Sequence, residues 1–372
     1  MGQGEPVVFT LIVWGNDTMR ETEILLKTTM MYTSSPLDFH LIVDADSQEY
    51  LTNAYNLIEK PVYDIRVYFY PISWKAMEER LARTAVGKPD QPRYMELGTK
   101  HQSGTPGMMK VLLHEIIPDN VKRSIFVDSD AFFLTDPTLL WQEFNTWGPE
   151  VAVSLPAHDS VDMYDGTTKI CSCVMLLDLE RMRQLRYIDS NLFTPAERAR
   201  ALSPKANLFA FGEPTSKNGV YNNVGLGDQT YFYANKIFMP EAHKDLPLHW
   251  EVTSCLMWTY GTGLSGSDMM TGEEQVKHQV NLKGTPFEDV PIIPGIVHFN
   301  CMYAHTYFES GFFEDPESYL YKGWLHAVRY HQYFKWLWLN KGKTGATLTI
   351  ETATDLRFWD EKRAGKLEAA GY

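Results

Sequence analysis

Two aspartates separated by one serine stand in the middle of the chain, in the stretch RSIFVDSDAFFLTD at residues 123–136. Asp128 and Asp130 follow the apolar run Ile125–Val127, and the chain becomes apolar again at Ala131. Two carboxylates held this close repel each other, so a buried pair usually has a cation beside it. The pattern therefore predicts a cation site, and the question is which cation fills it.

The Asp-x-Asp pattern alone is a weak signal, because it arises by chance about once in a few hundred residues. A second instance, Asp44-Ala45-Asp46, also follows an apolar stretch. The ordinary role for either pair is a carboxylate at a strand end that accepts hydrogen bonds from turn amides. We assign this structural role to Asp44 and Asp46, and the chemical role to Asp128 and Asp130.

Three further residues favour that choice. His298 emerges from the apolar run PIIPGIVHFN, and one histidine with two carboxylates suits an octahedral Mn²⁺ or Mg²⁺ better than a closed zinc site. Asp228 begins a predicted helix after Gly227, where it could also be a simple cap. Lys110, on a predicted helix before the Asp128 strand, could supply a cation to a diphosphate; the alternative is an ordinary surface lysine.

Composition limits the class of protein. The chain has 372 residues, 44% hydrophobic and 22% charged, which is enough to bury a large core. Its formal net charge of −13 and the lack of basic runs argue against a nucleic-acid partner. No apolar stretch approaches the roughly 20 residues that span a bilayer. We expect a globular protein, with membrane contact only through a possible N-terminal anchor missing from this sequence.

The apolar pattern alternates between strands and helices. Strands are predicted at 7–14, 39–46, 64–72, 123–130, 150–155 and 170–177. Helices are predicted at 19–31, 47–59, 105–118, 137–144, 180–186, 228–236 and 316–340, and a polar Gly- and Ser-rich loop at 260–274. The sequence therefore predicts an α/β fold with an open, mostly parallel twisted sheet. In such sheets, ligands collect at the carboxyl ends of strands, where Asp128 and Asp130 lie.

The four cysteines are Cys171, Cys173, Cys255 and Cys301, too few for a disulfide scaffold. We expect them to be structural, since a free cysteine behaves as a small hydrophobe. Alternation along a strand would place Cys171 and Cys173 on one face and Ser172 on the other. Asn16 heads the one glycosylation sequon noted, Asn16-Asp17-Thr18.

Several of these motifs together resemble the retaining glycosyltransferases of family eight, which have the GT-A fold and a Rossmann-like nucleotide-binding half. The segment from His101 to Trp141 resembles the one that leads into that family's metal motif. Along the whole chain, six further motifs occur in the family's order: TLIVWGN, FHLIVDA, CSCVMLLDLERM, GDQTYFYA, LPLHWEV and VHFN. Within the family, the chain most resembles the xylosyltransferase domain of dystroglycan-extending enzymes and the glucoside xylosyltransferases. The resemblance covers about residues 7–340 and implies one catalytic domain at 1–345, followed by a C-terminal extension at 346–372.

The resemblance implies roles for particular residues. Asp128, Asp130 and His298 match the ligands that hold Mn²⁺, or Mg²⁺, on the diphosphate of a UDP-sugar donor. Asp228 and Gln229 match the pair beside the reacting carbon of the sugar, and with Lys110 they form the expected catalytic set. The residues expected to contact the nucleotide sugar are Val13, Trp14, Asn16, Lys110, Ser129 and Ser172.

The chain also departs from the family's pattern. Cys171-Ser172-Cys173 replaces the usual Asn-Ser-Gly or Asn-Thr-Gly against the sugar, and Thr230 replaces a frequent third acid. The family's C-terminal phosphate-binding lysine has no clear equivalent after His298. The identity of the donor sugar therefore stays open, with UDP-xylose as our first expectation and UDP-glucose as the second.

The resemblance implies transfer of a sugar, with retention and an α-linkage, to a hydroxyl of a glycan or glycoprotein. It also implies a Golgi or other secretory-lumen protein, anchored by a segment that precedes the sequence given; a cytoplasmic transferase is the alternative. Two other functions remain open. One is a non-catalytic nucleotide- or glycan-binding protein of the same fold. The other is a phosphatase of the haloacid dehalogenase type, whose Asp-x-Asp normally lies on the first strand and is followed by Thr or Val where this chain has Phe132.

Overall fold

The protein is described here by a computed structural model, which covers residues 4–84, 103–157, 169–212, 227–254, 294–300, 302, 306–343 and 345–369. The loop predicted at 260–274 lies outside the described residues, as do Cys255 and Cys301.

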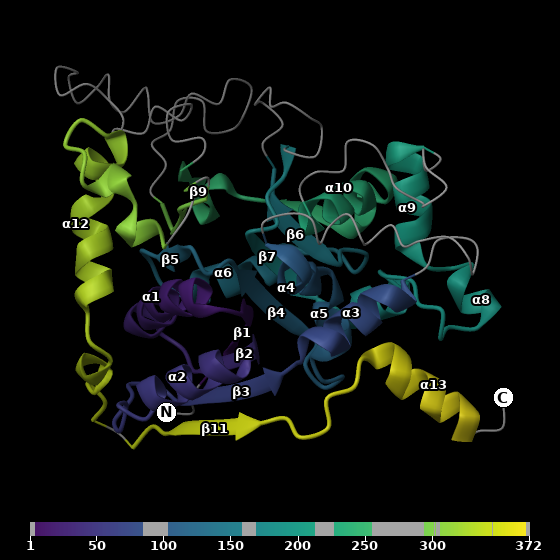
Figure 1. Ribbon diagram of the computed structural model, residues 1–372, viewed down its shortest axis with the longest axis horizontal. Coiled ribbons are helices and arrows are strands. Elements are labelled where there is room, and N and C mark those ends of the chain that lie inside the picture. The colour runs from purple at the N-terminus through teal and green to yellow at the C-terminus, as the bar shows by residue number, and fades with distance from the viewer. Residues whose placement is uncertain are drawn as a thin grey trace.

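A mixed sheet of eight strands runs through the molecule (Figure 1). Its order is β11-β3-β2-β1-β4-β7-β6-β8. The five strands from β11 to β4 are parallel, β7 runs antiparallel to both β4 and β6, and β8 is parallel to β6. The prediction of an open, mostly parallel sheet is therefore confirmed. The strands are β1 Val7–Val13, β2 Leu37–Val43, β3 Ile65–Pro71, β4 Arg123–Val127, β6 Val153–Pro156, β7 Val174–Asp178, β8 His243–Leu246 and β11 Leu348–Thr352.

Just after the two aspartates, the chain leaves the large sheet and enters a second, smaller sheet. It contains β5 (Ala131–Phe133), β9 (Val252–Thr253) and β10 (Ile296–His298), in the order β5-β10-β9. Residues 128–130 are thus the short link from β4 in the large sheet to β5 in the small sheet. His298 pairs with Ala131 in the antiparallel β5–β10 register, which brings it next to this link.

Helices cover both faces of the large sheet (Figure 1). One buried core joins β1–β3 to α1 and α2, and a second joins the other face to α3, α5 and α7. β2 is buried throughout, as a central strand covered on both faces requires, although its sequence includes Asp38 and His40. The longer helices are α1 Asn16–Tyr32, α2 Ala45–Tyr55, α3 Trp74–Arg83, α9 Leu202–Phe211, α10 Asp228–Phe238, α12 Tyr319–Tyr333 and α13 Trp359–Ala369. The shorter ones are α4 Gly104–Met108, α5 Leu113–Ile116, α6 Pro137–Gln142, α7 Leu179–Leu185 and α8 Pro195–Arg198.

Two predicted helices are interrupted. The helix predicted at 105–118 is α4, a 3-10 turn at Met109–Leu112 and then α5. Glycines and a proline near its start have low helix propensity, and Lys110 lies in the 3-10 turn that follows. The helix predicted at 316–340 is α12 followed by a 3-10 turn at Trp336–Leu339, because Phe334 and Lys335 adopt extended backbone angles.

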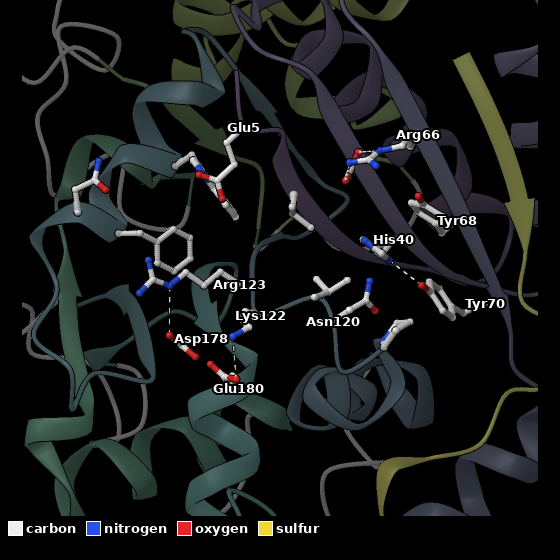
Figure 2. A pocket seen from close by; sticks show the side chains of 17 residues that line it. Glu5, His40, Arg66, Tyr68, Tyr70, Asn120, Lys122, Arg123, Asp178 and Glu180 are labelled. Carbon is white, nitrogen blue, oxygen red and sulfur yellow. Dashed lines mark hydrogen bonds and ion pairs between the residues drawn. The ribbon is translucent and has the colours of Figure 1, made fainter. Parts of the chain in front are cut away.

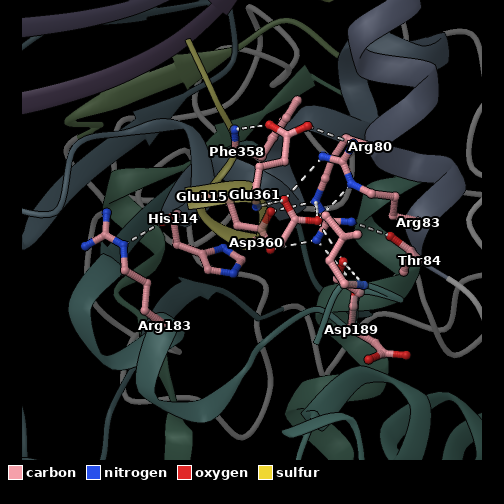
Figure 3. A network of polar contacts seen from close by, with 12 residues as sticks. Arg80, Arg83, Thr84, His114, Glu115, Arg183, Asp189, Phe358, Asp360 and Glu361 are labelled. Carbon is pink, nitrogen blue, oxygen red and sulfur yellow. Dashed lines mark hydrogen bonds and ion pairs between the residues drawn. The ribbon is translucent and has the colours of Figure 1, made fainter. Parts of the chain in front are cut away.

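The residues after 345 contribute to the sheet and to the core. β11 pairs in parallel with β3, and α13 brings the fully buried Asp360 to the arginines of α3 (Figure 3). Asp360 lies 2.9 Å from Arg83 Nε and 3.4 Å from Arg80 Nε. The buried Arg80 also donates two 2.6 Å hydrogen bonds to the carboxylate of Glu115 in α5. Asp360 therefore ties the C-terminal helix to α3 through a buried ion network.

We expect Asp360→Asn to lower the free energy of unfolding by about 3 kcal/mol, because it removes one charge from a buried, hydrogen-bonded cluster. Asp355→Asn is the matched control: its carboxylate pairs with Arg357 at the surface, so the change should stay within about 0.5 kcal/mol. Urea unfolding of both variants measures the difference. Equal losses would show that the network does not hold α13.

Candidate active site

Lys110 places a cation beside Asp128, the first aspartate of the pair. The side chain is buried, and its Nζ lies 2.7 Å from Oδ1 of Asp128 and 3.5 Å from Oδ2 of Asp228. Burial lowers the pKa of Lys110, but the two carboxylates raise it more strongly, so its net pKa lies above the ordinary value. The alternative of an ordinary surface lysine is therefore wrong, and the ammonium group is charged at neutral pH.

Asp228 joins this cluster from the first residue of α10. It is buried and accepts a 2.7 Å hydrogen bond from Oγ of Ser172, which lies just before β7. Asp228 is the first residue of α10, after the N-cap residue Gly227, and its carboxylate faces Lys110 and Ser172. Gln229 follows it in the same helix.

His298 faces the second aspartate. Its Nε2 lies 3.2 Å from Oδ1 of Asp130, while its Nδ1 lies 3.1 Å from Oε1 of Glu251. Burial lowers the pKa of His298, but Asp130 and Glu251 outweigh burial and raise it to about 10. Burial in turn raises the pKa of Asp130, and His298 reverses that effect, leaving it below its ordinary value. The imidazole therefore lies between two carboxylates.

The two aspartates themselves remain within reach of solvent. The Asp128 side chain is 24% exposed and that of Asp130 is 28% exposed, whereas the Glu251 side chain is fully buried. Burial raises the pKa of Asp128 to about 6, although Lys110 acts in the opposite direction. The two carboxylates are thus partly exposed, while the charged groups that contact them are buried. A ligand can therefore reach the carboxylates from solvent.

The residues fit a divalent metal ion. Asp128, Asp130 and His298 each offer one ligand atom, and these atoms lie within 4.8 Å of one another. Two carboxylates and one imidazole suit Mn²⁺ or Mg²⁺ and would leave other positions free for phosphate oxygens and water. Glu251 contacts the imidazole nitrogen that faces away, as carboxylates commonly do behind metal-binding histidines.

Sequence reasoning missed two acidic residues at this site. Besides Glu251, the site includes Glu21 of α1, which accepts hydrogen bonds from Oγ of Ser129 at 3.2 Å and from the backbone nitrogen of Tyr307 at 3.1 Å. Burial and the nearby Asp130 raise the pKa of Glu21 to about 8. Glu251 stands alone in an apolar stretch, WEV, a signal that could have identified it. Glu21 lies among other polar residues and gives no such signal.

The residues predicted to meet the nucleotide lie at the carboxyl end of β1 and the start of α1. The Val13 side chain is buried in the core, so only its backbone is available to a ligand. Trp14 is partly buried, and its ring centroid lies 6.2 Å from that of Trp74 in α3. Asn16 is exposed.

In the second Asp-x-Asp pair, Asp44 has the structural role assigned to it. Asp44 caps α2 and accepts hydrogen bonds from the backbone nitrogens of Ser47 and Gly15, both at 2.7 Å. Asp46 is exposed. The prediction of turn amides as partners is confirmed for Asp44.

The expectation for Cys171 and Cys173 needs correction. They are joined by a disulfide, and β7 begins only at Val174. The cysteines lie in the turn before the strand, where side chains two residues apart can meet. The expected separation from Ser172 holds, because Ser172 contacts Asp228 while the sulfur of Cys171 lies 4.0 Å from Nδ1 of His298.

A separate cavity lies at the opposite ends of the parallel strands (Figure 2). Its volume is about 600 Å³, and its lining includes Glu5, His40, Arg66 and Asn120. Glu5, Arg66 and Asn120 stand near the amino ends of β1, β3 and β4, and His40 lies midway along β2, whereas ligands in open α/β sheets collect at the carboxyl ends. The candidate active site is therefore the cluster around Asp128 and Asp130.

We expect Asp128→Asn to weaken Mn²⁺ binding by at least about 100-fold, since even residues behind metal ligands contribute 10–100-fold. Asp46→Asn is the control, because it alters an exposed Asp-x-Asp carboxylate in the structural pair. Isothermal titration calorimetry of Mn²⁺ on both variants measures the effect. Similar losses would mean that the wrong pair was chosen.

No protein-family model matches the sequence. Curated relatives include the xylosyl- and glucuronyltransferase LARGE1 of Gallus gallus, 28% identical over 44% of this chain and 19% of that protein. LARGE1 of Danio rerio is 24% identical over 67% of this chain and 30% of that protein, and LARGE2 of Mus musculus is 30% identical over 42% and 20%. The matched region thus spans less than a third of the length of each of these relatives.

Solved structures share the fold. Mouse xyloside xylosyltransferase 1, apo form, aligns with a TM-score of 0.52 at 17% identity, over 80% of this chain and 99% of that one. The galactosyltransferase LgtC, in complex with donor and acceptor sugar analogues, aligns with a TM-score of 0.50 at 10% identity, over 87% and 95%. The chain is therefore a homologue of the LARGE xylosyl- and glucuronyltransferases and has the GT-A fold found in family-eight glycosyltransferases.

Proposed function

We propose that the protein is a metal-dependent glycosyltransferase that moves a sugar from a UDP-sugar to a hydroxyl of a glycan or glycoprotein. One observation carries this proposal: a buried lysine is held between Asp128 at the metal cluster and Asp228 at the start of α10. A phosphate leaving group and the sugar that it leaves need charges of opposite sign on either side of the breaking bond. Lys110 and Asp228 supply one charge of each sign, 3.5 Å apart beside the metal cluster.

On the leaving-group side, Asp128, Asp130 and His298 would hold Mn²⁺ or Mg²⁺. The ion would supply a Lewis acid to the diphosphate oxygens of the donor. Lys110 would add a positive charge to the same group, and its burial strengthens that interaction because little water screens it. The negative charge that develops on the departing diphosphate is then stabilised by groups already in place.

On the sugar side, Asp228 and Gln229 would face the carbon that becomes cation-like. Ser172 donates a hydrogen bond from its hydroxyl group to Asp228 and so fixes the direction of that carboxylate. We propose retention, by attack of the acceptor hydroxyl on the leaving-group face, with the departing phosphate taking its proton. The product would carry an α-linkage.

The nucleotide would bind at the end of β1, through the backbone of Val13 and the side chains of Trp14 and Asn16. Trp74 is 45% exposed beside Trp14, and this tryptophan pair offers an aromatic face to the base. Ser129 completes the contacts with the nucleotide sugar from the link between the aspartates.

UDP-xylose is the first candidate donor and UDP-glucose the second. The disulfide of Cys171 and Cys173 stands where the family has an amide and a glycine, and its sulfurs cannot replace an amide that hydrogen-bonds a sugar hydroxyl. A small donor with fewer groups to recognise fits this change.

A disulfide is also typical of an oxidising compartment, which supports a Golgi or other secretory-lumen location. Within the part of the chain that the structure describes, no helix has the length and apolar composition needed to cross a membrane.

The other functions are less well supported. The phosphatase alternative needs its Asp-x-Asp on the first strand, whereas Asp128 follows β4, inside a GT-A fold. A non-catalytic binding protein would not need Lys110 and Asp228 to face each other in addition to a metal site. Its discriminating property would be binding of a UDP-sugar with no release of UDP.

We expect UDP release from at least one of UDP-xylose, UDP-glucose, UDP-galactose and UDP-N-acetylglucosamine in the presence of Mn²⁺. Excess EDTA should abolish this release. Asp130→Asn should lower kcat/KM by at least about 100-fold, because Asp130 would help to hold the metal ion whose charge stabilises the leaving group. Asp46→Asn should keep the wild-type rate. Full turnover in EDTA would contradict a metal-dependent reaction, and binding without turnover would identify a binding protein.

A further inference from the structure

His298 belongs to two different groups of metal-binding atoms, one on each ring nitrogen. Its Nε2 faces Asp130, which together with Asp128 and His298 forms the first group. Its Nδ1 faces Glu251 at 3.1 Å and the sulfur of Cys171 at 4.0 Å. The first group, of oxygen and nitrogen ligands, serves the proposed transfer reaction. The proposed reaction uses no metal ion bound by the second group.

The second group consists of Cys171, Cys173, Glu251 and His298. One ligand atom from each lies within 4.8 Å of the others, and all four residues are buried. Two thiolates, one imidazole and one carboxylate are ligands that Zn²⁺ binds in tetrahedral sites. In the disulfide form the sulfurs are bonded to each other and do not offer thiolates.

We propose that reduction of the Cys171–Cys173 disulfide creates a zinc site formed by both cysteines, Glu251 and Nδ1 of His298. The reductant is a dithiol, which breaks the sulfur–sulfur bond by thiol–disulfide exchange. Two electrons and two protons pass to the cysteines, and the reductant leaves as its own disulfide. Each cysteine then gives up its proton on binding Zn²⁺ as a thiolate.

The local structure permits this change. The two sulfurs would have to move to roughly 3.8 Å apart, as two ligands at about 2.3 Å from a tetrahedral zinc require. The cysteines precede β7 and belong to no strand of the described sheet, so side-chain rotation need not break strand pairing. Their separation of two residues means that the disulfide closes a very short loop, which contributes little to stability.

Zinc at this site would exclude the metal of the first site. A neutral imidazole has one ring proton, so binding a metal through Nδ1 leaves that proton on Nε2. Nε2 would then donate a hydrogen bond to Asp130 and could not ligate Mn²⁺. This consequence rests on the proposed function. Transferase activity would then require the oxidised protein, because the disulfide keeps His298 available to Asp128 and Asp130.

The test measures Zn²⁺ binding in the absence of donor, acceptor and Mn²⁺. The full chain is compared in its oxidised form and after reduction with dithiothreitol followed by anaerobic removal of the reductant. We expect about one Zn²⁺ to bind the reduced protein at least 100-fold more tightly than the oxidised protein. Co²⁺ used as a spectroscopic probe should show thiolate-to-cobalt charge transfer only in the reduced protein.

Variants locate the site. Cys171→Ser with Cys173→Ser should abolish the reduction-dependent binding, whereas Cys255→Ser with Cys301→Ser and Asp128→Asn with Asp130→Asn should retain it. Equal Zn²⁺ affinity in both redox forms, or binding that survives loss of Cys171 and Cys173, would overturn the proposal. So would binding that requires the two aspartates. Because no nucleotide sugar is present, absence of transferase activity would not affect this result.

With zinc bound, Mn²⁺ affinity of the reduced protein should fall by at least tenfold, and EDTA followed by reoxidation should restore it. Unchanged Mn²⁺ affinity in the zinc-loaded protein would overturn the exclusion between the two sites.

Discussion

The site depends on one ammonium group, that of Lys110, placed between two carboxylates. Without it, Asp128 and Asp228 would face each other across a buried region with no compensating charge, a costly arrangement. His298 has the same relation to Asp130 and Glu251. Positive and negative groups therefore alternate from Asp228 to Glu251, with Asp128 and Asp130 adjacent at the centre. A divalent cation would therefore stabilise the site most at that central, partly exposed pair of carboxylates.

The rest of the fold serves to bring these groups together from distant parts of the sequence. Lys110 arrives on a 3-10 turn, Asp228 on the first residue of α10, and His298 at the end of β10. The three-residue link from β4 to β5 joins the two sheets, and the pairing of His298 with Ala131 sets the histidine beside Asp130. A backbone hydrogen bond of 2.7 Å from Asp128 to Cys173 ties the same link to the disulfide turn. The metal cluster and the cysteine pair are thus parts of one local structure.

Sequence patterns predicted those parts of the fold that depend on local periodicity. The strands through β4 and the cap at Asp44 follow from apolar runs and from the preference of aspartate for turn amides. The structure also brings Asp128, Asp130 and His298 within reach of one ion, which the choice of this Asp-x-Asp pair requires. The contacts of Glu21 and Glu251 were not predicted, because no motif linked either residue to its partner more than 40 positions away. The disulfide was missed because strand alternation was extended through residues 171–173, which form a turn.

The central claim is that one divalent ion binds at Asp128, Asp130 and His298. It is tested most directly by anomalous diffraction at the manganese absorption edge, from crystals of the oxidised protein grown with Mn²⁺ and UDP. We expect a single strong peak within coordination distance of both carboxylates and of Nε2 of His298, with Lys110 on the diphosphate. A peak at Asp44 and Asp46, a peak on the Glu251 side of the imidazole, or UDP bound with no peak at the aspartates would contradict it.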